Sequence, residues 1–263
     1  MTDRSTDTIA LFQSERQRQI VSLTMQAGRV EVSHLADMFQ VTTETIRRDL
    51  SDLQRQKVVR RVHGGGIPWE TSVFEPRVEI RADQNDDQKR RMALKAIEEL
   101  PDHGSIIIDS GSTLTRFAEA IPSGPTLSVV TNSLPVAQAL AQRQSLDVIV
   151  TGGRLMKDTM ALVDQQAIAS VEPLTVDTLF ISTDAATAAT GLTTPYRHEA
   201  ALKQAMIQAA RRVVALVDHS KFGKDEFIRF AEWTDIDVLI TTTELSPTVR
   251  ADIEATGATV VLA

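Results

Sequence analysis

Seven short apolar runs, most of them separated by segments with helical periodicity, restrict how this 263-residue chain can fold. Such runs are typical of strands buried on both faces, and their alternation with helices indicates a parallel sheet covered on both sides. We therefore predict an α/β fold with a doubly wound, mostly parallel sheet. The predicted strands are Ser105–Ile108, Thr126–Thr131, Asp147–Thr151, Thr178–Ser182, Val213–Val217, Val238–Thr241 and Thr259–Leu262, and the clearest helices are Gln88–Leu100, Leu114–Ala120, Pro135–Arg143 and Arg197–Arg211.

The N-terminal part of the chain has a different pattern, with three helical segments. In the third, Ile46, Leu50 and Leu53 have the spacing of one buried helical face. Thr42 directly precedes this segment and is predicted to be its N-cap. Two helices, a tight turn and a third helix that enters the major groove of DNA form the helix-turn-helix plan. The segments run from Ser14 to Gly28, from Val32 to Phe39 and from Thr43 to Leu53.

The polar side of the third segment carries hydroxyl and guanidinium groups at Thr43, Thr45, Arg47 and Arg48. These groups suit contacts with DNA phosphates and base edges. A helix whose two arginines are merely solvated would show the same pattern. The segment alone therefore leaves both interpretations open.

The residues that follow favour DNA binding. A short alternating strand carrying Arg60 and Arg61 runs through His63 into the triple glycine Gly64–Gly66. This arrangement predicts a wing, with the three basic residues on or near it. A triple glycine is also compatible with a loop that binds phosphate. Pro68 follows at once without a helical pattern, which favours a turn.

The net charge of −7 is distributed unevenly. Residues 1–68 have ten Lys or Arg and eight Asp or Glu, a net charge of +2, whereas the remainder has a net charge of −9. Between Thr45 and His63 there are six basic and two acidic residues. The basic surface is therefore local, as a positioned DNA contact requires, although ordinary solubility would also produce some asymmetry.

The composition excludes several classes of protein. Without cysteine the chain has no disulfide, no thiolate metal site and no cysteine nucleophile. No apolar run approaches the length of a membrane span, and no signal peptide is evident. We expect a cytoplasmic protein without a membrane partner or a cofactor.

The predicted domain boundaries follow from these patterns. Residues 1–68 are expected to form the winged helix-turn-helix domain and residues 88–263 the sheet domain. Residues 69–87 contain Pro76 and several charges but little apolar periodicity, so we interpret them as a linker.

Three predicted strands end in small polar residues. Glycine and hydroxyl groups at a helix N-terminus favour an anion, because the first backbone amides and the helix dipole both point to it. Each turn alone is better explained by helix capping, but three at one edge of a sheet predict a shared anionic pocket. The turns are Asp109-Ser110-Gly111-Ser112-Thr113, Thr131-Asn132-Ser133 and Thr151-Gly152-Gly153-Arg154.

Further charged residues lie later in the chain. Glu199 and Lys203 share one helical face, either as a surface ion pair or as groups that bind sugar hydroxyls and negative charge. Lys221 follows a predicted strand together with His219, which is as consistent with a turn as with a ligand contact. Neither metal-ligand spacing nor a Ser-His-Asp arrangement is evident.

The N-terminal motifs resemble those of the DeoR family of bacterial regulators. The resemblance is carried by Thr45-Ile46-Arg47-Arg48-Asp49-Leu50 and by Arg60-Arg61-Val62-His63-Gly64-Gly65-Gly66, where the family usually has Ala in place of Gly66. It implies that Thr43, Thr45, Arg47 and Arg48 lie at the DNA and that the wing lies near its backbone.

The C-terminal motifs resemble the sensor domains of the same family. This resemblance implies a fold like that of ribose-5-phosphate isomerase and an effector that is a sugar phosphate, with Asp184 at the site. Ser112 stands where the family more often has Thr, and Ser182-Thr183-Asp184-Ala185-Ala186 stands where Gly-Ala-Asp-Gly is usual. The shared motifs are Asp109–Thr113, Thr131–Ser133, Gly152-Gly153, Gly191–Thr193, Glu199–Lys203 and Asp218–Lys221.

Together these features predict a transcription regulator, most simply a repressor of a carbohydrate uptake or catabolism operon. It would bind double-stranded operator DNA as a homodimer or homotetramer, and a phosphorylated sugar would change its DNA affinity. The alternative is a sugar-phosphate isomerase or deaminase with Asp109, Asp184 or Glu199 as the base and Lys203 or Lys221 stabilising an enediolate. Such an enzyme needs no winged helix-turn-helix, so we expect a protein that is not an enzyme.

Overall fold

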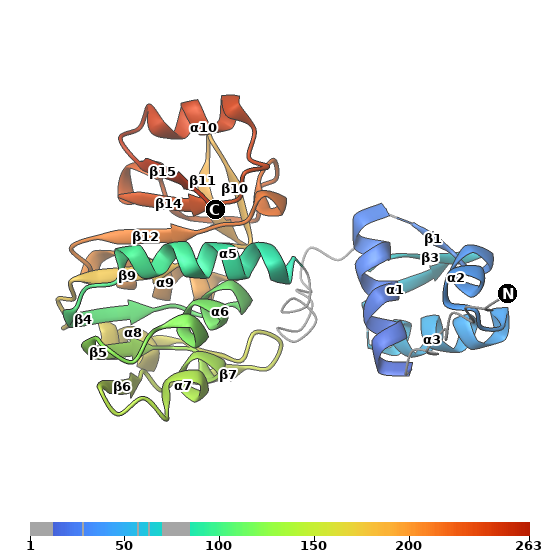
Figure 1. The fold of residues 1–263 in the computed structure, drawn as a ribbon, viewed down its shortest axis with the longest axis horizontal. Coiled ribbons are helices and arrows are strands. Elements are labelled where there is room, and N and C mark those ends of the chain that lie inside the picture. Colours follow the sequence, from blue (N-terminus) through green and yellow to red (C-terminus); the bar gives the residue numbers. More distant parts are fainter. Residues whose placement is uncertain (1–12, 28, 57, 63, 70–84) are drawn as a thin grey trace, which may run out of the picture. The chain divides into compact units, whose positions relative to one another are not determined.

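The computed structural model describes residues 13–27, 29–56, 58–62, 64–69 and 85–263 (Figure 1). The chain divides into two units, Met1–Pro76 and Arg77–Ala263, and each is described by itself. Most of the predicted linker and all of His63 lie outside the described residues. No helix in these ranges is both long enough and apolar enough to cross a membrane.

The N-terminal unit packs its helices around a small antiparallel sheet. Ile46 and Leu50 are fully buried and Leu53 is 2% exposed, which confirms the predicted apolar face of the third helix. Thr42 Oγ1 accepts a hydrogen bond from the backbone N–H of Thr45 at 3.1 Å, so the predicted N-cap is also confirmed. The elements are α1 (Gln13–Ala27), β1 (Val30–Glu31), α2 (Val32–Phe39), α3 (Thr43–Arg55), β2 (Val59–Val62) and β3 (Gly65–Pro68), with strand order β1-β3-β2.

The triple glycine belongs to a hairpin. β2 and β3 pair antiparallel, with Val62 opposite Gly65. Gly64 has a φ of +78°, the left-handed conformation that a tight turn requires. A Cβ on Gly65 would lie 1.9 Å from the carbonyl oxygen of Val30, so the close approach of β1 demands glycine there. The predicted wing is therefore present, and these glycines serve a turn and strand packing.

The C-terminal unit is built on a seven-stranded parallel sheet with the order β15-β14-β12-β9-β4-β5-β6. The chain starts in the middle at β4, proceeds outward through β5 and β6, and then crosses back to β9. This reversal is a topological switch point, where α/β proteins usually bind ligands. All seven predicted strands are confirmed, as β4 (His103–Ile108), β5 (Thr126–Thr131), β6 (Leu146–Val150), β9 (Thr178–Ile181), β12 (Val213–Leu216), β14 (Val238–Thr241) and β15 (Thr259–Leu262).

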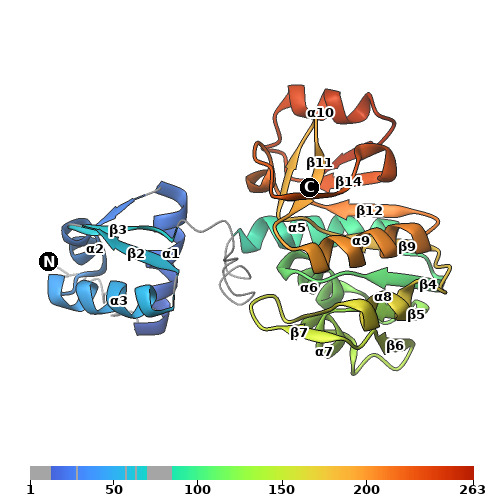
Figure 2. The same ribbon diagram turned by 180° about the vertical axis from the view of Figure 1, so that it is seen from behind.

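Helices cover both faces of this sheet, as Figures 1 and 2 show from opposite sides. Ile106 and Ile108 of β4 pack with α5 (Asp86–Ala96), α6 (Ser112–Ala120) and α7 (Leu134–Leu140). Ile107 faces the other way, into a second layer with α8 (Gln165–Val171) and α9 (Arg197–Ala209). Ile253 of α10 (Pro247–Glu254) belongs to this second layer. The doubly wound α/β architecture is therefore confirmed.

Several short elements were not predicted from the sequence. α8 and α10 are among them, together with two small antiparallel sheets. β7 (Arg154–Met156) pairs with β8 (Ala161–Val163), and β10 (Ala185–Thr187), β11 (Gly191–Thr194) and β13 (Ile228–Ala231) form a three-stranded sheet. The 3₁₀ helices are η1 (Ile97–Glu99), η2 (His219–Lys221) and η3 (Trp233–Asp235). The predicted helix Gln88–Leu100 corresponds to α5 followed by η1.

Candidate nucleic-acid interface and ligand site

The outer face of α3 presents the predicted DNA contacts. Thr43, Arg47 and Arg48 are exposed, and Thr45 is half-buried. The hydroxyl groups of Thr42 and Thr45 lie 2.9 Å apart, so part of their hydrogen-bonding capacity is used within the cap. The two arginines therefore provide most of the positive charge that α3 offers to DNA.

The wing is tied to α3 by Arg61. Its backbone N–H donates to Gln54 Oε1 at 2.9 Å, and its guanidinium Nη1 donates to Ser51 Oγ at 2.8 Å. Arg60, the other predicted wing residue in the described part, is exposed. Arg61 thus fixes the wing against the recognition helix in addition to carrying positive charge.

A buried ion pair anchors α3 to α1. Arg16 Nε lies 2.6 Å from Asp49 Oδ2, and the Asp49 side chain is only 1% exposed. Gln17 Nε2 donates to the other carboxylate oxygen at 3.1 Å. Sequence analysis missed this contact because both residues belong to charged stretches, 33 positions apart. The pair holds the recognition helix at a fixed angle to the first helix.

In the C-terminal unit, buried charges meet at the switch point. Lys203 Nζ of α9 forms an ion pair with Asp109, which follows β4, and donates to the carbonyl oxygen of Ser182, which follows β9, at 2.9 Å. Burial alone would lower the pKa of Lys203, but the negative charges of Asp109 and Glu199 outweigh it and raise this pKa. Lys203 is therefore a charged residue that joins α9 to two strand ends.

Glu199 and Lys203 do share one face of α9, but they are not a surface pair. Each is 5% exposed, and the ion-pair partner of Lys203 is Asp109. The surface alternative is thus wrong. The i, i+4 spacing within the helix could not reveal the pair of Lys203 with Asp109, because Asp109 lies on another element.

Glu199 has an unusual proton affinity. Burial and the nearby charge of Asp184 raise the pKa of Glu199 to about 7. The hydroxyl group of Thr194 lies 2.8 Å from Asp184 Oδ2 and 3.1 Å from Glu199 Oε2. A hydroxyl group has only one proton to donate, so a proton on Glu199 completes the second hydrogen bond.

The loop after β4 leaves an open helix N-terminus. Gly111 is the N-cap residue of α6, has a φ of +128° and provides no side chain to cap the helix. The amides of Ser112 and Thr113 are among those that have no intrahelical acceptor. α7 differs, because Ser133 Oγ accepts from Val136 N at 3.3 Å. Of these two helices, only α6 therefore offers uncapped first-turn amides to a ligand.

The turn after β5 contributes a buried amide. Asn132 is 2% exposed, and its Oδ1 has no hydrogen-bond partner among the described residues. Thr131 Oγ1 accepts from the backbone N–H of Ser133 at 3.1 Å, so its hydroxyl shapes the turn. An unpartnered buried polar atom is costly. A polar ligand at this edge would satisfy it.

Positive charge reaches the same edge from the loop after β12. Lys221 and Lys224 form no ion pair within the described parts of the chain. Burial and the positive charge of Lys221 lower the pKa of Lys224. Asp218 is buried, and the charges of Lys221 and Lys89 help to hold its pKa low against that burial.

Sequence analysis missed Lys89, Lys224 and Thr194. Lys224 could have been noticed, because it follows Lys221 by three positions in a glycine-containing loop. Lys89 and Thr194 gave no such signal, because the sheet topology brings them to the site.

The third predicted turn has a different surrounding. Arg154 Nε lies 2.5 Å from Asp164 Oδ2, and the same carboxylate contacts His198 Nδ1. A Cβ on Gly153 would lie 2.4 Å from the carbonyl oxygen of Val163, so β8 requires glycine there. Gly152 has a φ of +72°. Arg154 is therefore already paired, and the glycines have a structural purpose.

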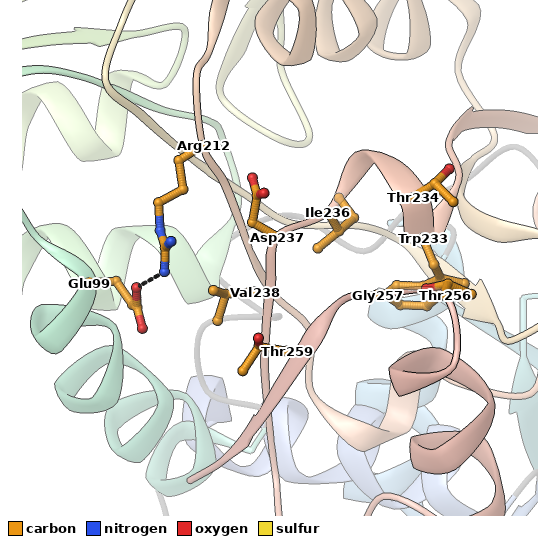
Figure 3. Close-up of a pocket in the computed structure, with 10 residues that line it drawn as sticks. All are labelled: Glu99, Arg212, Trp233, Thr234, Ile236, Asp237, Val238, Thr256, Gly257 and Thr259. Atoms are coloured by element: carbon orange, nitrogen blue, oxygen red, sulfur yellow. Dashed lines mark hydrogen bonds and ion pairs between the residues drawn. The ribbon is translucent and has the colours of Figure 1, made fainter.

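The opposite, amino-terminal edge of the sheet contains a hollow. A hollow of about 480 Å³ lies at the amino-terminal ends of β12, β14 and β15 (Figure 3). Its arginine, Arg212, points to Glu99 and contacts Glu99 Oε2 at 2.5 Å. The carboxyl-terminal edge has two lysines, Lys221 and Lys224, that form no ion pair with any residue the structure describes, so it is better suited to an anion.

A family model of the DeoR C terminal sensor domain matches residues 84–243, and one of the DeoR-like helix-turn-helix domain matches residues 16–70. The chain belongs to the DeoR family. The HTH-type transcriptional regulator GlpR of Haloferax volcanii is 36% identical over 251 residues, 95% of this chain and 98% of that protein. The glycerol-3-phosphate regulon repressor of Escherichia coli K12 is 30% identical over 229 residues, 87% of this chain and 90% of that protein.

Among solved structures, ribose 5 phosphate isomerase A from Neisseria gonorrhoeae is 23% identical and covers 54% of this chain and 55% of its own, with a TM-score of 0.39. Both of these relatives, which match this chain over most of its length, are named as transcriptional regulators. This member of the DeoR family is accordingly a regulator and not an enzyme.

In this DeoR-family sensor unit, Glu199 predicts a dependence of stability on pH. The pKa of Glu199 is higher in the folded protein than in the unfolded chain. Its stabilising contribution is therefore complete below pH 4.5 and is lost as the pH rises through about 7. Relative to Glu199→Gln, the wild type should lose about 2–3 kcal/mol of unfolding free energy from about pH 5 to pH 8. Urea unfolding of both proteins across this range measures the difference. Parallel profiles would show that Glu199 is ionised throughout.

Proposed function

We propose that this DeoR-family regulator is a repressor of an operon for carbohydrate uptake or catabolism. It binds double-stranded operator DNA through α3 and the wing, and a phosphorylated sugar bound at the carboxyl-terminal edge of the sheet changes its affinity for DNA. It acts in the cytoplasm, where the operator lies. Because repeated half-sites are bound by symmetric oligomers, it functions as a homodimer or homotetramer.

The observation that carries the proposal is the bipolar set of groups at this edge. The open N-terminus of α6 and the positive charges of Lys221 and Lys224 suit a phosphate group. Asp184, Glu199 and the unpartnered Oδ1 of Asn132 suit hydroxyl groups of a sugar. The name of the Escherichia coli relative, a glycerol-3-phosphate regulon repressor, supports a phosphorylated ligand.

The test begins with DNA fragments from the upstream region of the protein's own gene. Fluorescence anisotropy at moderate salt, titrated with a panel of sugar phosphates and their unphosphorylated counterparts, measures both activities. We expect sequence-specific binding that one class of sugar phosphate changes and its parent sugar does not. Absence of sequence-specific binding would refute the proposed repressor function. If no sugar phosphate changed the DNA affinity, the proposed effector would be refuted.

Two substitutions should weaken ligand binding without changing operator binding. Ser110→Ala and Lys221→Ala each remove a polar group from the phosphate side, and a hydrogen bond to a charged group is worth about 1.5–3 kcal/mol, so affinity for the sugar phosphate should fall roughly tenfold to a hundredfold. Thermal shift against ligand concentration measures this affinity. Operator binding should be unchanged.

Lys95→Ala is the matched control. Lys95 is a lysine near the C-terminal end of α5, where it forms an ion pair with Glu98. Its removal should leave the ligand-induced shift intact. Equal losses in Lys95→Ala and Lys221→Ala would mean that only the net charge of the protein matters.

A further inference from the structure

α3 carries a carboxylate on the face that the proposed function assigns to DNA. Of the three acidic residues on this helix, Asp49 is buried against Arg16, and Asp52 contacts Arg55 at 2.5 Å and Gln13 at 3.1 Å. Glu44 differs from both, because its side chain is 74% exposed. Its contact with Arg47 is long, at 3.4 Å between Oε2 and Nη1. Two of the three carboxylates are therefore held by short contacts, whereas Glu44 is exposed and has only the favourable helix N-terminus and a long contact with Arg47.

The position of Glu44 on the helix is central to the DNA-facing side. Each residue of an α-helix turns the chain by about 100°, so Glu44 and Arg48 lie one above the other, opposite the buried stripe that contains Ile46 and Leu50. Glu44 also lies in the first turn of the helix. In helix-turn-helix proteins, the N-terminal residues of the recognition helix are those that contact base edges.

A carboxylate at this place is unfavourable against the sugar-phosphate backbone. Duplex DNA carries about one negative charge per 1.7 Å of its axis, and the ion pair with Arg47 is exposed and worth only tenths of a kcal/mol. What a carboxylate offers in the major groove is acceptance of a hydrogen bond from a base amine, and the exocyclic N4 of cytosine is its characteristic partner.

We infer that Glu44 reads a cytosine in each operator half-site, accepting a hydrogen bond from its N4 amine in the major groove. This inference rests on operator binding as proposed above and adds a base-level determinant to it. Arg47 and Arg48 on either side neutralise the approach of the carboxylate to the phosphates. Glu44 thereby contributes specificity at the expense of general affinity for DNA.

The first experiment is selection of bound sequences from random DNA with the wild type, Glu44→Ala and Glu44→Gln. The wild type should select a cytosine at one position of each half-site, and Glu44→Ala should reduce that preference about tenfold or more. Glu44→Gln retains an oxygen acceptor and should keep part of it. Affinity of Glu44→Ala for unrelated DNA should rise, because a negative charge has been removed.

Glu15→Gln is the matched control, since Glu15 is another exposed carboxylate in the first turn of a helix of this unit. It should change no base preference. Thermal unfolding of every variant confirms that the unit is folded. An unchanged preference of Glu44→Ala at every position would overturn the inference while leaving operator binding intact. Failure of the wild type to select any sequence would overturn both.

A second experiment separates direct reading from support of Arg47. The selected cytosine is replaced by 2-pyrimidinone, which pairs in the duplex but lacks the 4-amino group, and the guanine on the other strand is kept. The wild type should lose about tenfold in affinity beyond the loss that Glu44→Ala shows. Equal losses in the two proteins would mean that Glu44 acts only through Arg47, which would overturn the inference.

Discussion

Replacing Arg47 and Arg48 together by alanine should weaken binding to the selected operator roughly a hundredfold or more at moderate salt. Both guanidinium groups lie on the exposed face of α3, and a good bidentate contact to a base is worth about 1–3 kcal/mol. For each phosphate contact that is lost, the slope of log affinity against log salt should fall by about 0.9. Anisotropy titrations at several salt concentrations measure both quantities.

The control for this double variant is Arg250→Ala. Arg250 is a partly exposed arginine of α10 that pairs with Glu254 at 2.8 Å, so its loss changes the net charge without touching α3. Ligand-induced thermal shifts should be the same in all these proteins. Operator affinity that falls equally in Arg250→Ala would show that long-range charge, and not the helix face, determines binding.

Replacing Lys203 by methionine should destabilise the C-terminal unit by about 3–5 kcal/mol, because it leaves the carboxylate of Asp109 buried without a counterion. The carbonyl oxygen of Ser182 also loses its donor. Urea unfolding followed by a spectroscopic probe of the sensor unit measures the change. Affinity for a sugar phosphate should fall as well, since Lys203 positions two strand ends at the site.

The double variant Lys203→Met with Asp109→Leu provides the control. Removing both charges should recover much of the lost stability, since an apolar pair can replace a buried ion pair at little cost. Ligand binding should not recover with it. If Lys203→Met alone were as stable as the wild type, Asp109 would be free to lose its charge or to reach water, and the pair would not join α9 to the sheet.

The sheet could be predicted from the sequence because its strands are buried on both faces and therefore carry continuous apolar runs, as Val213–Leu216 does. The small antiparallel sheets could not be predicted in this way. β10 and β11 consist of alanine, threonine, glycine and a single leucine, and they are buried by the segments that surround them. α8 has seven residues and buries only Ala167 and Val171, too few for a recognisable helical period.

The candidate site also has parts that could be predicted from the sequence and parts that could not. Local turns such as the one after Ile108 were visible because glycine and hydroxyl residues interrupt an apolar run. The ion-pair partners of the charged residues could not be predicted from the sequence. Lys203 meets Asp109 across 94 positions, and Arg154 meets Asp164 through a short hairpin. From sequence alone, a charged residue is expected to be exposed. Only the folded structure shows whether a counterion allows it to be buried.

The strand order has a consequence for the protein during its synthesis. β4 pairs with β9, which comes much later in the chain, and Lys203, Lys221 and Lys224 follow later still. The N-terminal unit is complete long before Lys203 and Lys224 have been translated. A nascent or truncated chain that ends before β9 therefore contains every residue proposed to contact DNA, but it lacks Asp184, Glu199, Lys221 and Lys224 of the proposed ligand site.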